Sequence, residues 1–115
     1  MKAFILICIT LFFSNDQGYS IKGDTITFRY ANDGTGMEVF VSGNFNGWSK
    51  DASWQMKYKE GEGYELSVPI SMVRKPNQSF YEFTFRVNDK LLDAPSNAPN
   101  VIHCAGYGSR YVIRF

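Results

Sequence analysis

Apolar and polar residues alternate along most of the chain, which is the pattern of β-strands with one buried face. The clearest run covers residues 80–87, in which apolar side chains share one face and polar side chains the other. The same alternation predicts strands over residues 25–30, 37–42, 54–59, 64–68 and 111–115. No segment has the 3.6-residue period of an amphipathic helix. The pattern therefore predicts an all-β protein.

Turn residues separate the predicted strands at short intervals. Residues 60–63 (EGEG) would join two of these strands as a hairpin. Trp54 alternates with Met56 and Tyr58 in the strand before this turn, so we expect Trp54 in the core. About seven short strands in a domain of this size are typical of an immunoglobulin-like β-sandwich.

The N-terminus has the pattern of a secretory signal peptide. Lys2 precedes an apolar run over residues 3–13, and a polar stretch with small residues at Gly18 and Ser20 follows. As a helix this run would span about 16 Å, roughly half of a bilayer core, so it is not a transmembrane anchor. The alternative is a buried element of the fold. We expect cleavage after Ser20, export to the periplasm or the cell exterior, and a single mature domain over residues 21–115.

Composition and charge exclude several classes of protein. The chain has 115 residues, enough for one domain, and a net charge of +1, without the clustered basic face that nucleic acid needs. His103 is the only histidine, so we expect no metal site and no cofactor. Neither a Ser-His-Asp set nor a suitably spaced carboxylate pair stands out, so we expect no enzyme. Removal of residues 1–20 leaves Cys104 as the single cysteine, which we expect to be a buried, unreactive thiol.

Three loops have unusual composition for simple connections. They are residues 43–49 (GNFNGWS), 88–100 (NDKLLDAPSNAPN) and 105–110 (AGYGSR). In the first, Gly43 permits a close backbone approach and Asn46-Gly47 is a turn signal. Trp48 at the edge of that turn either lies open as a flat platform for a sugar ring or plugs the end of the sandwich. Tyr107 stands between two glycines and is expected to be exposed.

Residues 39–49, VFVSGNFNGWS, resemble the signature of glycogen-binding domains of the AMP-activated kinase β-subunit type. These domains form carbohydrate-binding module family 48, within the early set of immunoglobulin-like domains. The likeness continues through the strand YEFTFRV and the Asp-Ala-Pro at residues 93–95, and it covers about residues 25–115. The resemblance implies a module that binds an α-glucan, such as glycogen, starch or maltodextrin, without acting on it.

The resemblance also implies five carbohydrate-binding residues. Trp48 matches a tryptophan that stacks on a sugar face, and Tyr107 matches an apolar residue that wedges into the curved glucan. Ser109, Arg110 and Lys90 would hydrogen-bond sugar hydroxyls.

Two positions depart from the family pattern. The family's strand lysine falls on Thr84, and its second tryptophan falls near Lys90 or Leu91, where no aromatic residue stands. The alternative is therefore a protein-interaction or structural β-sandwich module whose sugar site has decayed. Its partner would be a protein, and Trp48 would then be a structural residue.

Overall fold

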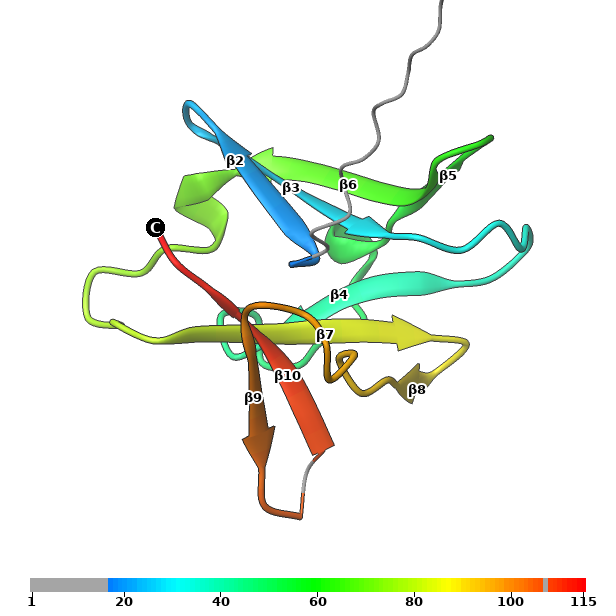
Figure 1. Cartoon of the computed structure of the whole chain (residues 1–115). Coiled ribbons are helices and arrows are strands. Elements are labelled where there is room, and N and C mark those ends of the chain that lie inside the picture. Colours follow the sequence, from blue (N-terminus) through cyan, green and yellow to red (C-terminus); the bar gives the residue numbers. More distant parts are fainter. Residues whose placement is uncertain (1–16, 107) are drawn as a thin grey trace, which may run out of the picture.

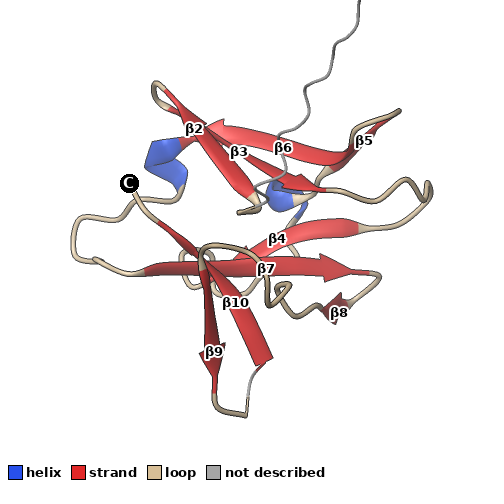
Figure 2. Ribbon diagram, viewed as in Figure 1, coloured by secondary structure: helices blue, strands red, loops and turns tan. Residues whose placement is uncertain are grey.

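The computed structural model describes residues 17–106 and 108–115. The apolar run of the predicted signal peptide and the predicted site residue Tyr107 therefore lie outside the described residues. Two antiparallel sheets face each other as the layers of a sandwich (Figures 1 and 2). The described part contains no helix of the length and apolar character needed to cross a membrane.

The upper layer in Figure 1 is a four-stranded sheet with the order β2-β3-β6-β5. Its strands are β2 (Tyr19–Lys22), β3 (Thr25–Tyr30), β6 (Gly63–Pro69) and β5 (Lys57–Lys59). The lower layer is a five-stranded sheet with the order β4-β7-β10-β9, in which β8 also pairs with β7. Its strands are β4 (Val39–Gly43), β7 (Tyr81–Val87), β10 (Gly108–Ile113), β9 (Val101–Cys104) and β8 (Lys90–Leu91). The connections contain two short 3₁₀ helices, η2 (Ala52–Trp54) and η3 (Ile70–Met72).

The order of the strands is that of an immunoglobulin-like sandwich. Lettered along the chain, such a sandwich pairs strands A-B-E-D in one sheet and C-F-G in the other. The chain reproduces this order when β2 to β7 are taken as A to F and β10 is taken as G. Strands β8 and β9 are additions in the connection between β7 and β10. The predicted immunoglobulin-like β-sandwich is confirmed, with two short strands more than the seven expected.

The inward-facing residues of the strands form an aromatic core. Tyr81, Phe83 and Phe85 on β7 are all buried, as the alternation over residues 80–87 predicts. The centroid of the Phe83 ring lies 5.0 Å from those of Phe28 and Tyr111. Burial of each side chain of this kind contributes about 1.5–3 kcal/mol, so this cluster is a main source of stability.

The hairpin predicted across residues 60–63 is confirmed, because β5 and β6 pair in antiparallel fashion around it. Trp54 and Met56 are buried, as expected. Trp54 lies in η2, however, so β5 is shorter than the strand predicted from the alternation.

Loops cover the outer face of the five-stranded sheet, although the alternation predicted that the polar residues of this face meet water. Ser42 and Thr84 on that face are 0% and 1% exposed. The Oγ of Ser42 donates a hydrogen bond to the carbonyl of Ser49, and the Oγ1 of Thr84 donates one to the carbonyl of Leu92, both at 2.7 Å. These bonds fix two loops on the outer face, where they satisfy the buried hydroxyls.

Strand β2 begins at Tyr19, before the predicted start of the mature domain. The carbonyl of Gly18 accepts a hydrogen bond from the Arg29 N–H at 3.0 Å, and the Tyr19 hydroxyl accepts one from the Arg114 N–H at 2.9 Å. Tyr19 is buried and belongs to the core. This segment is therefore part of the sandwich, and cleavage after Ser20 would divide β2. The position of cleavage stays a prediction.

Candidate functional site

The turn over residues 43–49 starts from a glycine that has no room for a side chain. A Cβ on Gly43 would lie 2.5 Å from the carbonyl oxygen of Glu82 and 2.5 Å from the Phe45 ring. The Phe45 ring is buried, with its centroid 5.4 Å from that of Trp54. The predicted close approach at Gly43 is confirmed, and Phe45 anchors the turn in the core.

Asn46 closes this turn through its side-chain amide. Its Oδ1 accepts a hydrogen bond from the Gly43 N–H at 3.0 Å, and its Nδ2 donates one to the carbonyl of Val41 at 2.9 Å. Gly47 follows with φ 68°, as the Asn-Gly pair predicts. The N–H of Trp48 then donates to the carbonyl of Gly43 at 2.9 Å. The turn therefore holds Trp48 in a defined position.

Trp48 has a left-handed backbone conformation, with φ 57°, and its side chain is half-buried. This conformation favours glycine, and for a residue with a Cβ it costs about 1–3 kcal/mol. Hydrogen bonds on both sides of the residue hold it there. The N–H binds the carbonyl of Gly43, and the carbonyl accepts a hydrogen bond from the Nη2 of Arg86 at 3.1 Å.

Arg110 on β10 packs against the Trp48 ring. The central carbon of its guanidinium lies 5.4 Å from the ring centroid. Arg110 is 9% exposed, and its Nη1 donates a hydrogen bond to the carbonyl of Ser109 at 3.0 Å. Trp48 is the more exposed member of the pair, and the buried guanidinium packs over its ring. Such a cation–π contact is worth about 0.5–2 kcal/mol and fixes the orientation of the ring.

A charged network links the Trp48 turn to the end of β7. The Oδ1 of Asp89 accepts a hydrogen bond from the Nζ of Lys50 at 2.8 Å and lies 3.7 Å from the Nη1 of Arg86. The hydrogen bond and charge of Lys50, with a smaller effect of Arg86, hold the pKa of Asp89 below its usual range. Arg86 thus joins this network to the Trp48 carbonyl, although its Nε is buried without a hydrogen-bond partner.

The sequence patterns did not predict Arg86 or Lys50 as site residues. The only signal for Arg86 was its place on the polar face of residues 80–87. Its function in the turn depends on a loop that folds back over β7, which local sequence does not reveal.

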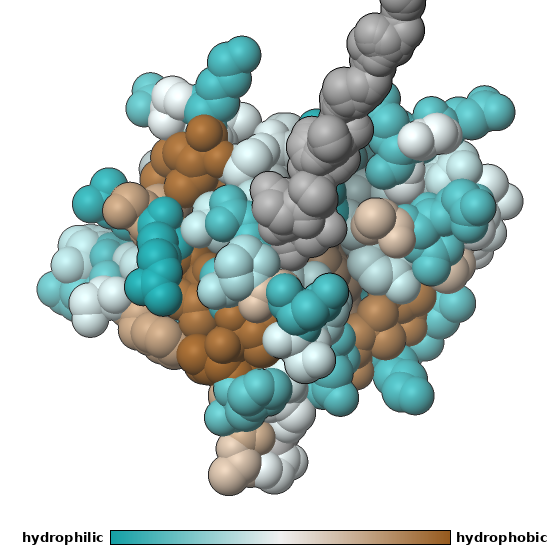
Figure 3. Space-filling view, in the orientation of Figure 1, coloured by the Kyte–Doolittle hydropathy of each residue, from teal (hydrophilic) through white to brown (hydrophobic). Residues whose placement is uncertain are grey.

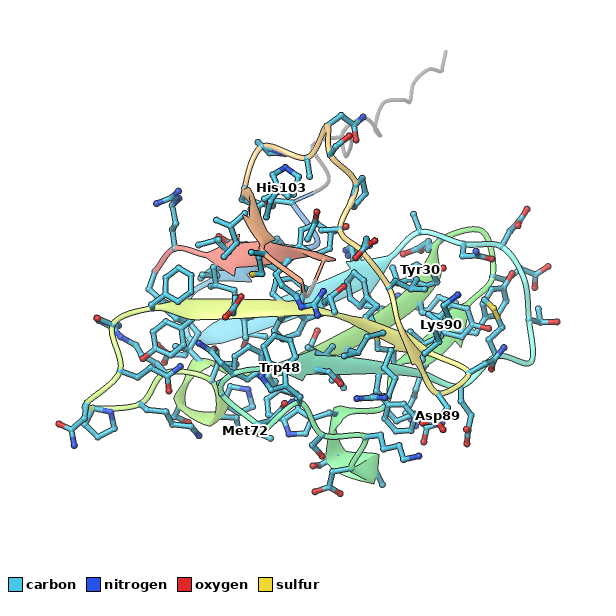
Figure 4. All side chains as sticks on the ribbon, turned by 90° about the horizontal axis from the view of Figure 1, so that it is seen from below. Tyr30, Trp48, Met72, Asp89, Lys90 and His103 are labelled. Carbon is cyan, nitrogen blue, oxygen red and sulfur yellow. The ribbon has the colours of Figure 1, made fainter. Side chains whose placement is uncertain are left out.

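Lys90 lies apart from Trp48. Figure 4 places Lys90 beside Asp89 at the end of β7, whereas Trp48 lies near the middle of the outer face of the sheet. Lys90 is exposed on β8, opposite Val87 in the register. The structure therefore does not bring this predicted residue to the Trp48 ring.

Ser109 points away from the face that carries Arg110, because neighbouring residues of a strand point to opposite faces. It lies opposite His103 in the register of β9 and β10. Its Oγ is 2.8 Å from the Nδ1 of His103, and its N–H donates to the Oδ1 of Asp93 at 3.2 Å. Of the predicted residues in the described part, the structure brings together Trp48 and Arg110.

Cys104 is half-buried rather than buried. Its thiol donates to the Oε1 of Glu82 at 3.8 Å. Burial, and then the negative charge of Glu82, raises the pKa of the Cys104 thiol, so the thiol stays protonated at neutral pH. Within residues 17–106 and 108–115, no group of three or more His, Cys, Asp or Glu residues is placed to hold a metal ion.

Comparison of the chain with models of known protein families gives no match, and comparison with curated proteins gives no significant match. The likeness of residues 39–49 to the glycogen-binding signature therefore supports a proposed function and does not assign the chain to a family.

Proposed function

We propose that this protein binds an α-glucan without acting on it, and that Trp48 is the platform on which a glucose ring stacks. The observation that carries the proposal is a half-exposed tryptophan with φ 57°. In a turn that served only the fold, the cation–π contact with Arg110, about 0.5–2 kcal/mol, would at best offset the strain of about 1–3 kcal/mol that glycine would avoid. Strained residues cluster at ligand sites, where the surrounding structure holds them ready.

The chemistry of glucose suits such a platform. A pyranose ring presents C–H groups on one face and hydroxyls around its rim, so a flat indole can cover the apolar face. In this proposal the sugar stacks on the face of the indole that Arg110 does not cover. The exposed pair of Lys50 and Asp89, linked to Trp48 through Arg86, offers donors and acceptors to the hydroxyls. The family likeness adds Tyr107, Ser109 and Lys90 as candidate contacts.

A single stacking ring implies weak binding to each glucan segment. Removal of a stacking ring costs about 1–3 kcal/mol for nucleic-acid bases, and we take the same order for a sugar. A polymer that carries many equivalent segments raises the apparent affinity. Retention by polymeric glucan is therefore a better measurement than binding of a short oligosaccharide.

The alternative is a protein-interaction or structural module, and a specific observation favours it. Thr84, at the position of the family's strand lysine, is 1% exposed and donates its hydroxyl to the carbonyl of Leu92. Leu91, near the position of the second tryptophan, offers no flat ring. In that case Trp48 holds the turn and contacts no sugar.

Affinity gel electrophoresis of the full chain separates the two functions. The gels contain glycogen, amylopectin or hydroxyethylcellulose, and we expect retardation in the first two only. Trp48→Gly relieves the backbone strain and should abolish retardation. Ile21→Ala, at an exposed apolar residue of β2, is the control and should be retarded normally. Folded wild-type protein that migrates freely in every gel would overturn the α-glucan proposal.

A further inference from the structure

An open groove of about 500 Å³ lies where β7 begins and β10 ends. We call it the Phe80 groove. Among its lining residues are Phe80, Ile102, Val112, Phe115, Arg74 and Arg114. Phe80 and Phe115 are 46% and 43% exposed, and they are two of the three large exposed apolar residues in the described part. Figure 3 shows apolar residues gathered over β7 and β10 near the C-terminus. The groove shares no residue with the Trp48 site.

The walls of the Phe80 groove are packed side chains. Ile102 comes from β9 and Val112 from the neighbouring strand β10, where it is buried. The Phe115 ring packs edge-on against Tyr81, with the centroids 5.0 Å apart. The guanidinium carbon of Arg74 lies 5.5 Å from the centroid of Phe115. These contacts hold the Phe115 ring and the Arg74 guanidinium in the wall of the groove.

The charged side chains in the lining of the Phe80 groove are cationic. Arg74 and Arg114 line it, and no Asp or Glu side chain does. Within the described residues, the basic side chains that form ion pairs are Arg29, Lys50, Lys59 and Arg86. Neither groove arginine is neutralised by such a pair. Arg74 also lines an adjoining hollow, in which the charges of Lys75 and Asp24 cancel and the charge of Arg74 remains.

We propose that the Phe80 groove binds an acidic peptide segment of a partner protein. Apolar side chains of the segment would pack against Phe80 and Val112, and its carboxylates would pair with Arg74 and Arg114. Guanidinium groups suit this function because they bind carboxylates through two parallel hydrogen bonds. Exposed apolar surface bordered by charge is typical of protein-interaction sites. Because the groove is concave and flanked by cations, it suits a peptide whose side chains can enter it better than the flat surface of a bilayer.

Chemical-shift mapping on the ¹⁵N-labelled full chain tests the proposal with two short synthetic peptides. One alternates Asp with Phe and Leu, and the other has Lys in place of every Asp. We expect the Asp peptide to shift the amide signals of the groove residues and the Lys peptide to shift none. Phe80→Ser should weaken binding about tenfold. Ile21→Ser removes an exposed apolar side chain outside the groove and should leave binding unchanged.

Charge reversal is the sharper test, because Arg74 and Arg114 are exposed and their replacement should not affect folding. The variant with Arg74→Glu and Arg114→Glu should no longer bind the Asp peptide and should bind the Lys peptide instead. Lys22→Glu should leave the binding of both peptides unchanged. The proposal is overturned if the Asp peptide shifts no groove signal or binds the reversed variant as well as the wild type. It is also overturned if only phosphatidylglycerol vesicles shift these signals, or if the signals shift only with protein concentration, which would indicate contact between two copies.

Discussion

The guanidinium of Arg110 lies against the ring of Trp48, with its central carbon 5.4 Å from the ring centroid. Trp48 follows β4 and Arg110 lies on β10, and the two meet over the outer face of β7, which separates those strands. Arg110 is buried, whereas Trp48 reaches solvent. The arginine therefore supports the aromatic ring. Substitution of Arg110 and substitution of Trp48 should have different effects on glucan retention and on stability.

Arg110→Gln should loosen the ring without removing it. We expect glycogen retention to fall about threefold, in line with the ~0.5–1 kcal/mol of a cation–π contact at an exposed site. The near-ultraviolet circular dichroism should weaken as the indole gains freedom. Arg29→Gln, at an exposed arginine of β3, is the control and should change neither measurement. Retention and spectrum that both stay at wild-type values would show that Arg110 does not position Trp48.

The two tryptophans should differ in their effect on stability. Trp48→Gly loses the contact with Arg110 but relieves the strain at φ 57°, so we expect a change in unfolding free energy within about 1 kcal/mol. Trp54 is 6% exposed against Phe45, and Trp54→Ala should cost about 3–5 kcal/mol. Urea unfolding followed by far-ultraviolet circular dichroism measures both. A loss of about 3 kcal/mol in Trp48→Gly would make Trp48 a structural plug.

The strands that could be predicted from the sequence are those in which every second side chain is buried and must therefore be apolar. Residues 80–87 lie between two neighbouring strands, and their inner side chains must be apolar, so the alternation is complete. In β2 only Tyr19 is buried, β8 has two residues, and β9 has no fully buried residue. Strand β2 alternates over only four residues and spans the expected cleavage site, whereas β8 and β9 are too short or too exposed to give a clear alternation. The pattern predicted none of these three strands.

The site was less predictable because loops and strand faces determine it. Ser109 and Arg110 are neighbours in sequence but point to opposite faces of β10, so only Arg110 reaches Trp48. Thr84 is polar yet buried, because the loop at Leu92 folds over it and accepts its hydroxyl. Such long-range contacts have no local signature in the sequence.

Gly43→Ala and Gly47→Ala should have different effects on the free energy of unfolding, although both glycines lie in the same turn. A Cβ at Gly43 would lie 2.5 Å from the backbone oxygen of Glu82, and that oxygen belongs to a central strand. We expect a loss of about 2–3 kcal/mol and weaker glycogen retention, because the turn must move. Gly47 has φ 68° and open space around it, so alanine there should cost only about 1 kcal/mol. Equal losses in urea unfolding would contradict this reading of the turn.

Lys50→Met should bring the pKa of Asp89 back toward its usual range. In the folded protein the hydrogen bond and charge of Lys50 lower that pKa, and Arg86 lowers it further. A folded pKa below the unfolded one gives stability that is complete above the unfolded pKa and is lost as pH falls through the folded pKa. The wild type should therefore lose more stability in acid than Lys50→Met does.

An NMR titration of the Asp89 carboxyl carbon measures this shift directly. Lys57→Met changes a lysine of β5 outside the network and should leave the titration unchanged. High salt should reduce the difference between wild type and Lys50→Met, because the pair is exposed and salt screens it. An Asp89 pKa that is the same with and without Lys50 would contradict the prediction.

The N-terminal boundary can be located from the contacts of β2. We propose that the chain is exported and cleaved, and we expect the mature N-terminus at or before Gln17. The carbonyl of Gln17 accepts a hydrogen bond from the Nδ2 of Asn100 at 3.0 Å, and the Tyr19 ring packs edge-on against Phe83. The intact mass of the exported protein identifies the cleavage site.

A chain that begins at Ile21 should be less stable than one that begins at Gln17. It loses the buried Tyr19 side chain, worth about 1.5–3 kcal/mol, and the hydrogen bond that the Tyr19 hydroxyl accepts from the Arg114 N–H, worth about 1 kcal/mol. Tyr19→Phe in the longer chain keeps the ring and should cost only the hydrogen bond. Urea unfolding of the three proteins ranks them. Equal stability of the two chain lengths, together with an exported protein whose mass begins at Ile21, would place the boundary after Ser20, within β2.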